Sequence, residues 1–194
     1  METEITTKPT RQFIEHVSRQ QHAMAGAVIA VSAAQAVALG EACVRISLEH
    51  QPDTLNEAEV LERAAHLADL KEQLAGWADR DATAIAEFVA LREAGQELQG
   101  QQLLCDSPTT VSRLCLEAAS YLQNFRPLAF ERVQDDLEMS ISLLAGTAQA
   151  AMLLLDSNLR IWPEAALLKK YEPIRLELEQ QIKRLTPAAR IRGK

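Results

Sequence analysis

One aspartate occupies a position where helical spacing makes a carboxylate unusual. Asp81 falls on the same helical face as Trp77 and Ile85, and that face is otherwise apolar. A carboxylate that points toward a core needs a partner, and a partly apolar setting suits it to general acid–base chemistry. The simpler interpretation is that Asp81 is a half-exposed residue at the flank of the apolar stripe. The sequence alone leaves both interpretations open.

A second aspartate, Asp136, opens an apolar helix and has Met139, Ser140 and Leu143 on the face above it. Aspartate is favoured near any helix N-terminus, because the exposed amides and the helix dipole stabilise its negative charge. Asp136 therefore has a purely structural explanation beside a functional one.

Other catalytic signatures are absent from the sequence, which holds no phosphate-binding loop, no GxGxxG after a strand, no HExxH and no nucleophile elbow. The four histidines share no spacing that indicates a metal or a catalytic triad, and we expect them at the surface. Cys43, Cys105 and Cys115 form no CxxC pair and have no nearby histidine to complete a zinc set. We therefore predict no metal site and reduced thiols.

The composition indicates the elements that must position these residues. Hydrophobic residues make up 47% of the 194 residues, but aromatic residues only 4%, so alanine and leucine supply most of the apolar content. No alternating apolar and polar run competes with the helical periodicity. We predict an all-α fold with one domain over residues 1–194, built as a bundle of five or six helices around two central Ala-rich apolar helices.

The expected helices follow from start and stop signals along the chain. The Gln-rich segment Gly95 to Asp106 is predicted to be a loop, and Ser107-Pro108 the start of the next helix. Asn56 followed by Glu59 is typical of a capping box. The predicted helices run from Thr10 into an Ala-rich helix that ends near His50, from Asn56 to about Ala94, from Ser107 to Arg126, from Asp135 to about Asn158, and from Trp162-Pro163 through Leu185.

Two uncharged stretches, Ala23 to Gly40 and Met139 to Leu155, approach the length of a membrane span. Serine, threonine and glutamine interrupt both, so we interpret them as core helices and predict no membrane association. One small protomer cannot cover two helices that are apolar on all sides, and we therefore expect an isologous homodimer.

The charge and the N-terminus bear on partners and compartment. The net charge of -7 comes without a basic stripe, which argues against nucleic acid as a partner. The segment Met1 to Thr10 is acidic and polar where a signal peptide needs a basic and then an apolar run, so we expect the protein in the cytoplasm.

Three segments together resemble the formiminotransferase-cyclodeaminase C-terminal family, the cyclodeaminase and methenyltetrahydrofolate cyclohydrolase group. Its Gly-Gly-Gly-Ser-Val turn before an Ala-rich helix corresponds to residues 24–28, Met-Ala-Gly-Ala-Val. Its Asp-Ala-x-Ala-Phe motif corresponds to residues 81–85, Asp-Ala-Thr-Ala-Ile. Its later aspartate, which opens a long helix ending in Arg-Ile-Asn-Leu, corresponds to Asp136 and the helix that ends at residues 156–159.

The resemblance implies one-carbon chemistry on a tetrahydrofolate derivative as substrate, by a cyclodeaminase or a cyclohydrolase. It implies Asp81 as the general acid–base and Asp136 as a residue that orients substrate or assists. Gly26 would let the backbone approach a ligand closely. For the anionic folate tail, Arg126 and Arg132 are the nearest basic residues in the loop before the second apolar helix.

The sequence departs from the family pattern at the proposed site. Gly26 is the only glycine left of three, Ala27 replaces the serine, and Leu154 stands where the family usually has asparagine. Met24 and Ala25 bring side chains where the family has bare backbone, so we expect a stable protein with weak folate binding. The alternatives are a non-catalytic helical homodimer that kept the scaffold and a carrier of apolar ligands between the Ala-rich helices.

Overall fold

The computed structural model describes residues 4–20 and 24–191. Within these residues the chain forms six α-helices and three short 3₁₀-helices, without strands, so the all-α prediction is confirmed. In chain order the elements are η1 (Ile5–Thr7), α1 (Thr10–Ser18), α2 (Ala25–His50), α3 (Glu57–Glu93), α4 (Glu97–Phe125), η2 (Arg126–Leu128), η3 (Glu131–Val133), α5 (Gln134–Ile161) and α6 (Ala165–Arg184).

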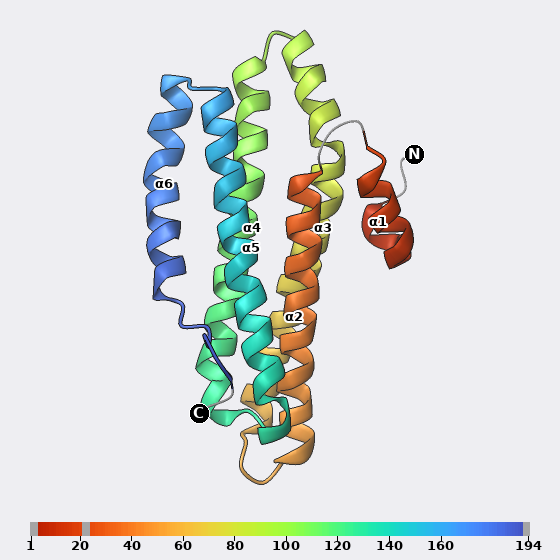
Figure 1. Ribbon diagram of the computed structural model, residues 1–194, viewed down its shortest axis with the longest axis vertical. Coiled ribbons are helices and arrows are strands. Elements are labelled where there is room, and N and C mark those ends of the chain that lie inside the picture. The colour runs from red at the N-terminus through yellow and green to blue at the C-terminus, as the bar shows by residue number, and fades with distance from the viewer. Residues whose placement is uncertain (1–3, 21–23, 192–194) are drawn as a thin grey trace.

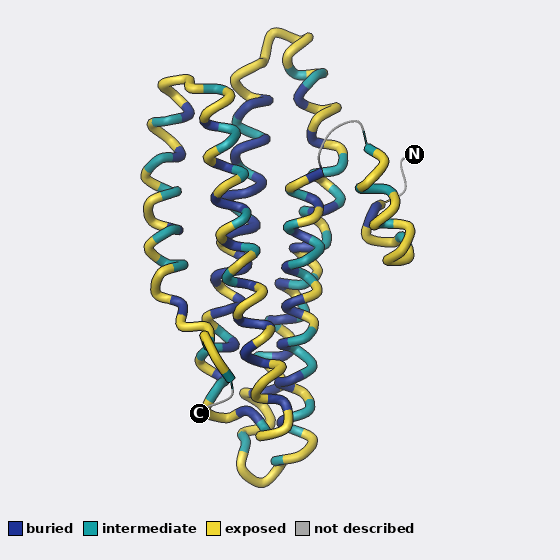
Figure 2. The backbone as a smooth tube through the Cα atoms, viewed as in Figure 1, coloured by how far each residue is buried: buried dark blue, intermediate teal, exposed yellow. Residues whose placement is uncertain are grey.

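Helices α2 to α5 form an up-and-down bundle in which each packs beside two others. Helix α2 contacts α3 and α5, and α4 contacts the same two helices from the other side. Helix α6 lies outside this ring against α5 and α4, and α1 lies apart beside the upper halves of α2 and α3 (Figure 1). Buried residues follow the inward sides of α2 to α5, so the core is a column between these four helices (Figure 2).

The start of α3 follows the predicted capping pattern. The Asn56 side-chain oxygen accepts a hydrogen bond from the Glu59 amide at 3.4 Å, and the Asn56 amide group donates to the Glu59 carboxylate at 3.0 Å. From this start the helix runs to Glu93, one residue short of the predicted end. Local capping and a long apolar stripe are sufficient to define this element.

The predicted loop at residues 95–106 is wrong, because α4 begins at Glu97 and continues through Pro108. A proline inside a helix leaves the carbonyl four residues earlier without its donor. Here that carbonyl belongs to Leu104, and the Asn158 side-chain amide of α5 donates to it at 2.8 Å. The lost backbone hydrogen bond is thus replaced from a neighbouring helix, and the helix does not need to start at Ser107.

Helix α2 and residues 131–161 are long and apolar enough to cross a membrane by length and composition alone. In the structure both contribute to the core of the bundle. The Ser140 hydroxyl donates to the Ala36 carbonyl at 2.7 Å, which ties α5 to α2. A Cβ at Gly40 would lie 2.4 Å from the Leu122 side chain, so α2 and α4 approach closely there. The two central apolar helices are confirmed as core helices, and the absence of membrane association stays a prediction.

Candidate functional site

The Asp81 carboxylate of α3 lies against the N-terminus of α2. Its Oδ2 atom accepts a hydrogen bond from the Ala27 amide at 2.7 Å, and the residue is half-buried. The first turn of a helix has amides without internal partners and a positive dipole end, and both stabilise a carboxylate. Asp81 therefore caps α2 through Ala27, a residue 54 positions earlier in the chain, and it also lines a cavity.

Gly26 is the residue that makes this contact sterically feasible. A Cβ atom built on Gly26 would lie 2.1 Å from Oδ1 of Asp81, well inside the contact distance of real atoms. Any larger residue would have to displace the carboxylate or the start of α2. The structure thus brings Gly26 and Asp81, two of the predicted site residues, into direct contact.

We call the space beside this contact the Asp81 cavity, and its volume is about 210 Å³. Four elements line it, with the residues Met24, Ala25, Gly26, Asp81, Ala84, Ile85, Leu104, Leu154, Asn158, Ile161 and Trp162. Asp81 thus lines a cavity, and its catalytic role stays a prediction. Three departures from the family pattern therefore line the same cavity: Met24, Ala25 and Leu154.

Met24 changes this cavity by its bulk. It is only 6% exposed and belongs to the hydrophobic core, and its carbonyl accepts the Val28 amide at 3.0 Å. Its φ of -94° is negative, so the turn before α2 needs no glycine conformation at this position. Met24 thus stabilises the start of α2 while filling space that a ligand could otherwise use.

A second cavity of about 300 Å³ lies between α3 and α4, and we call it the Trp77–Arg80 cavity. Its lining is Trp77, Arg80, Asp81, Thr83, Ala84, Glu87, Leu103 and Ser107. Asp81 and Ala84 line both cavities, so the carboxylate stands where the two adjoin. None of the other residues of the second cavity was predicted to belong to a site.

Asp136 lies far from this region within the protomer. It is exposed in the first turn of α5, and the burial of Cys43 together with the nearby Asp136 charge raises the pKa of that thiol to about 11. Asn158 of the Asp81 cavity lies on the same helix 22 residues later, which corresponds to roughly 33 Å of helix. The two predicted aspartates therefore do not form one site within a single chain.

The two predicted folate-binding arginines lie with Asp136 at that far end. The Arg126 guanidinium forms an ion pair with Glu138, Nε to Oε1 2.6 Å, and donates to the Thr186 carbonyl at 2.9 Å. Glu138 is only 3% exposed, and its carboxylate also accepts the Ala188 amide at 3.3 Å. Arg126 thus holds the segment after α6 against the bundle, while Arg132 is exposed in η3.

Other reactive groups of the described residues offer no second chemistry. Cys43, Cys105 and Cys115 are free and buried, and desolvation raises the pKa of each thiol to about 11. They are therefore neutral, unreactive thiols near neutral pH. Among residues 4–20 and 24–191, no group of three potential ligands could hold a metal ion.

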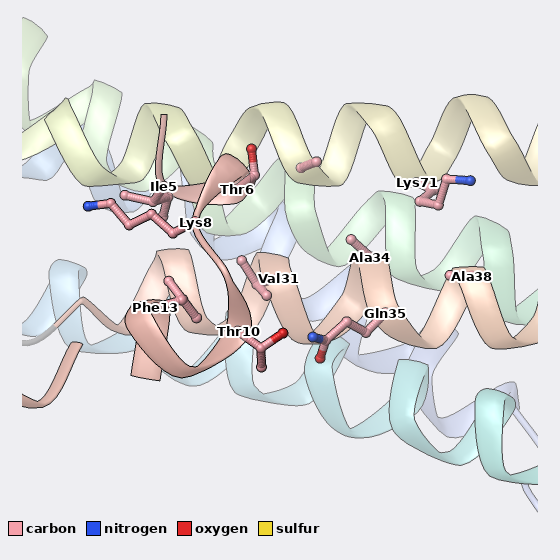
Figure 3. Close-up of a pocket in the computed structure, with 11 residues that line it drawn as sticks. Ile5, Thr6, Lys8, Thr10, Phe13, Val31, Ala34, Gln35, Ala38 and Lys71 are labelled. Atoms are coloured by element: carbon pink, nitrogen blue, oxygen red, sulfur yellow. The ribbon is translucent and has the colours of Figure 1, made fainter. Parts of the chain in front are cut away.

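An apolar cavity of about 280 Å³ lies under the N-terminal segment rather than between the two Ala-rich helices. Figure 3 shows residues 5–13 passing over α2, with Val31, Ala34 and Ala38 along α2 and Lys71 on α3. The Thr6 amide and hydroxyl both donate to the Asp79 carboxylate, at 3.0 and 2.7 Å, and hold this segment in place.

The fold and the site together define an all-helical bundle with a carboxylate at the mouth of an interhelical cavity. Residues 9–173 match the formiminotransferase-cyclodeaminase family, and the chain belongs to this family. The fold is similar to the crystal structure of formiminotetrahydrofolate cyclodeaminase from Thermotoga maritima, with a TM-score of 0.84 and 18% sequence identity over 93% of this chain and 92% of that chain. A search of curated proteins gave no sequence match.

The sequence did not single out Asn158, Trp162 or the Trp77–Arg80 pair as site residues. Asn158 had one usable signal, because Pro108 inside a helix requires a donor for Leu104 from elsewhere. Arg80 directly precedes Asp81 in the sequence, so once Asp81 was a candidate, the sequence already indicated that Arg80 lies near the site. Trp162 reaches the cavity only through the packing of the α5 end, which no local pattern indicates.

Proposed function

We propose that the protein binds a reduced folate at Asp81 and catalyses a cyclodeaminase or cyclohydrolase reaction slowly. The observation that carries the proposal is the Asp81 carboxylate, held on the α2 N-terminus where only Gly26 fits and facing two adjoining cavities. Membership of the family supports the substrate class, and the Thermotoga maritima structure with the same fold is of a formiminotetrahydrofolate cyclodeaminase.

Both reactions need a side chain that transfers protons and forms no covalent bond with the substrate. In cyclodeamination, the second folate nitrogen attacks the formimino carbon and loses its proton, and the carbon–nitrogen bond to the departing ammonia breaks as that nitrogen is protonated. In the cyclohydrolase reaction, water adds to the methenyl carbon and loses a proton; the bond from that carbon to one folate nitrogen then breaks as that nitrogen is protonated, which leaves a formyl group on the other nitrogen. The Asp81 carboxylate is the acidic side chain of the Asp81 cavity and takes up and returns this proton.

The small volume of the site supports slow rather than efficient turnover. Pockets for drug-sized ligands typically measure about 300 to 1,000 Å³, whereas the Asp81 cavity holds about 210 Å³. Met24 and Leu154 occupy positions where the family pattern has glycine and asparagine, so the cavity has less room and lacks the polar group that the family has at position 154. A folate therefore binds weakly, and its ring system is held mainly by apolar contacts.

We also propose a homodimer through the outward face of α5. Met139, Leu143 and Leu153 are 47%, 52% and 66% exposed, and they lie on the same side of the helix as Gly146, whose Cβ position meets nothing within 4 Å. A row of exposed apolar side chains with a glycine at its middle is suited to close helix packing.

Because Asp136 and Asp81 lie far apart in one protomer, Asp136 can assist catalysis at Asp81 only from a second copy of the chain. Light scattering that shows a stable monomer at micromolar concentration contradicts this proposal.

The competing function is a non-catalytic homodimer that kept the scaffold. The observation in its favour is that the hydrogen bond from Ala27 gives Asp81 a structural task, which capping alone explains. Titration with 5-formimino- and 5,10-methenyltetrahydrofolate, followed by turnover assays, decides between the two. Saturable binding and turnover support the enzyme, and their absence at millimolar ligand supports the scaffold.

Localisation in the cytoplasm and the absence of nucleic-acid partners remain proposals.

A further inference from the structure

The Trp77–Arg80 cavity contains an arginine, Arg80, without an ion-pair partner in the part of the chain that the structure describes. The Arg80 guanidinium carbon lies 4.9 Å from the centroid of the Trp77 ring, and the side chain is exposed. An arginine stacked on an aromatic ring is held in place while its N–H groups stay available to an anion.

Ser107 adds a hydroxyl group from α4 to the same cavity. The residue is only 6% exposed, and within the described part of the chain its hydroxyl has no hydrogen-bond partner. The hydroxyl oxygen itself is accessible at the cavity surface, so it can form a hydrogen bond with a ligand there. A positive charge and an unused donor therefore line one cavity together.

The remaining polar groups of the cavity define where an anion can lie. The Thr83 hydroxyl already donates to the Arg80 carbonyl at 3.0 Å. Glu87 is the one carboxylate besides Asp81 in this lining, and it lies seven residues after Arg80 on α3, roughly 10 Å along the helix. An anion is therefore attracted to the Arg80 end of the cavity and repelled from the Glu87 end.

We propose that Arg80, held by Trp77, and Ser107 bind a carboxylate of the benzoylglutamate part of the folate. This inference rests on the proposed function, in which the ring system occupies the Asp81 cavity. The Asp81 cavity is too small for a whole folate, and the Trp77–Arg80 cavity adjoins it at Asp81 and Ala84. One elongated ligand thus has its reacting atoms beside Asp81 and its anionic end at Arg80. Arg126, which already pairs with Glu138 at the far end, is not needed for this contact.

The experiment compares two ligands and two arginines. Tetrahydrofolate and a tetrahydropterin that lacks the benzoylglutamate group are titrated by calorimetry, up to millimolar concentration, into wild type, Arg80→Gln and Arg92→Gln. Arg92 is the matched control, because it also lies on α3 and stacks on an aromatic ring, Phe88, at 5.7 Å. We expect Arg80→Gln to weaken tetrahydrofolate binding about tenfold, the effect of one charged hydrogen bond, and to leave tetrahydropterin binding unchanged. Arg92→Gln should change neither.

Each outcome separates this inference from the proposed function. If Arg80→Gln binds tetrahydrofolate as tightly as wild type does, Arg80 is no anion contact, although the folate site stands. If the substitution weakens both ligands equally, Arg80 supports the fold of the site rather than the tail, and the inference is overturned. If wild type binds neither ligand, the proposed function fails and this inference fails with it. Arg80→Lys, which keeps the charge, should recover part of the affinity.

Discussion

The two ends of the bundle each place an aspartate at a helix N-terminus, but they do so in different ways. At one end Asp136 lies in the first turn of its own helix and is exposed. At the other end Asp81 comes from α3 to cap α2, is half-buried, and lies between two cavities. The same local preference for negative charge operates at both ends. Only the contact made across the fold places a carboxylate beside a cavity.

The basic residues of the two ends differ in the same way. Arg126 is engaged by the nearly buried Glu138 and by the segment after α6, so its donors are used within the fold. Arg80 stacks on Trp77 beside Asp81 and has no acidic partner among the described residues. An arginine that is close to a candidate site in sequence can therefore be structural, and its availability depends on which carboxylate the fold brings to it.

The largest expected difference between the two ends is in turnover. Asp81→Asn should lower turnover by about 10² to 10⁴-fold, the usual contribution of a general acid–base, because an amide cannot shuttle the proton. The Asn oxygen can still accept from the Ala27 amide, so the melting temperature should change little. Asp136→Asn is the matched variant, and in the same assay it should reduce turnover far less. Equal losses of turnover and melting temperature in Asp81→Asn would assign Asp81 to structure alone.

Opening the Asp81 cavity should trade stability for affinity. Met24→Gly with Ala25→Gly removes a core side chain, which we expect to cost about 2 to 5 kcal/mol of unfolding free energy. The same change clears the wall of the cavity and should tighten reduced-folate binding relative to wild type. Urea unfolding and calorimetric titration of the same samples measure the two effects. Robust turnover by the unmodified protein, or unchanged affinity in the folded variant, would show that these side chains do not limit the site.

The Gly26 contact should be sensitive to a single methyl group. Gly26→Ala forces a Cβ into the Asp81 carboxylate, and overpacking of this kind costs about 1 to 3 kcal/mol. Gly76→Ala on α3 is the control, since a Cβ there meets nothing within 4 Å and alanine favours a helix interior by about 0.5 to 1 kcal/mol. Urea denaturation should therefore give changes of opposite sign. A neutral Gly26→Ala would mean that Asp81 can move away freely.

The smallest predicted effect is on the pKa of Cys43, which the charge of Asp136 raises. Burial and the Asp136 charge raise the pKa of Cys43 from 9.0 to about 11, so its thiolate forms only at high pH. Removing that negative charge in Asp136→Asn makes the thiolate less unfavourable and should shift the alkylation profile of Cys43 to lower pH. Cys115, whose pKa is raised by burial and without Asp136, is the internal control. Mass spectrometry after timed alkylation measures both sites, and an equal shift at Cys115 would indicate loosening of the whole fold.

Much of the fold was predictable because its signals are local. Alanine and leucine at helical spacing determine that the chain is helical, and the Asn56 cap with its apolar stripe determines α3 to within a residue at its end. The two uncharged stretches could be assigned to the core for the same reason, since a helix that is apolar on all sides must be covered. Within the site, the family resemblance named Gly26 and Asp81, and the apolar face around Asp81 independently singled out that residue.

The tertiary structure alone decided how these elements meet. Helix α4 continues through Pro108 because Asn158, 54 residues beyond Leu104, supplies the missing donor. Asp81 caps α2 and lines two cavities. Asp136 and Arg126 lie at the far end of the bundle. Periodicity reports which face of a helix is apolar, but hydrogen bonds between helices depend on their register and crossing. Those are set by the packing of the whole bundle, and so no window of sequence contains them.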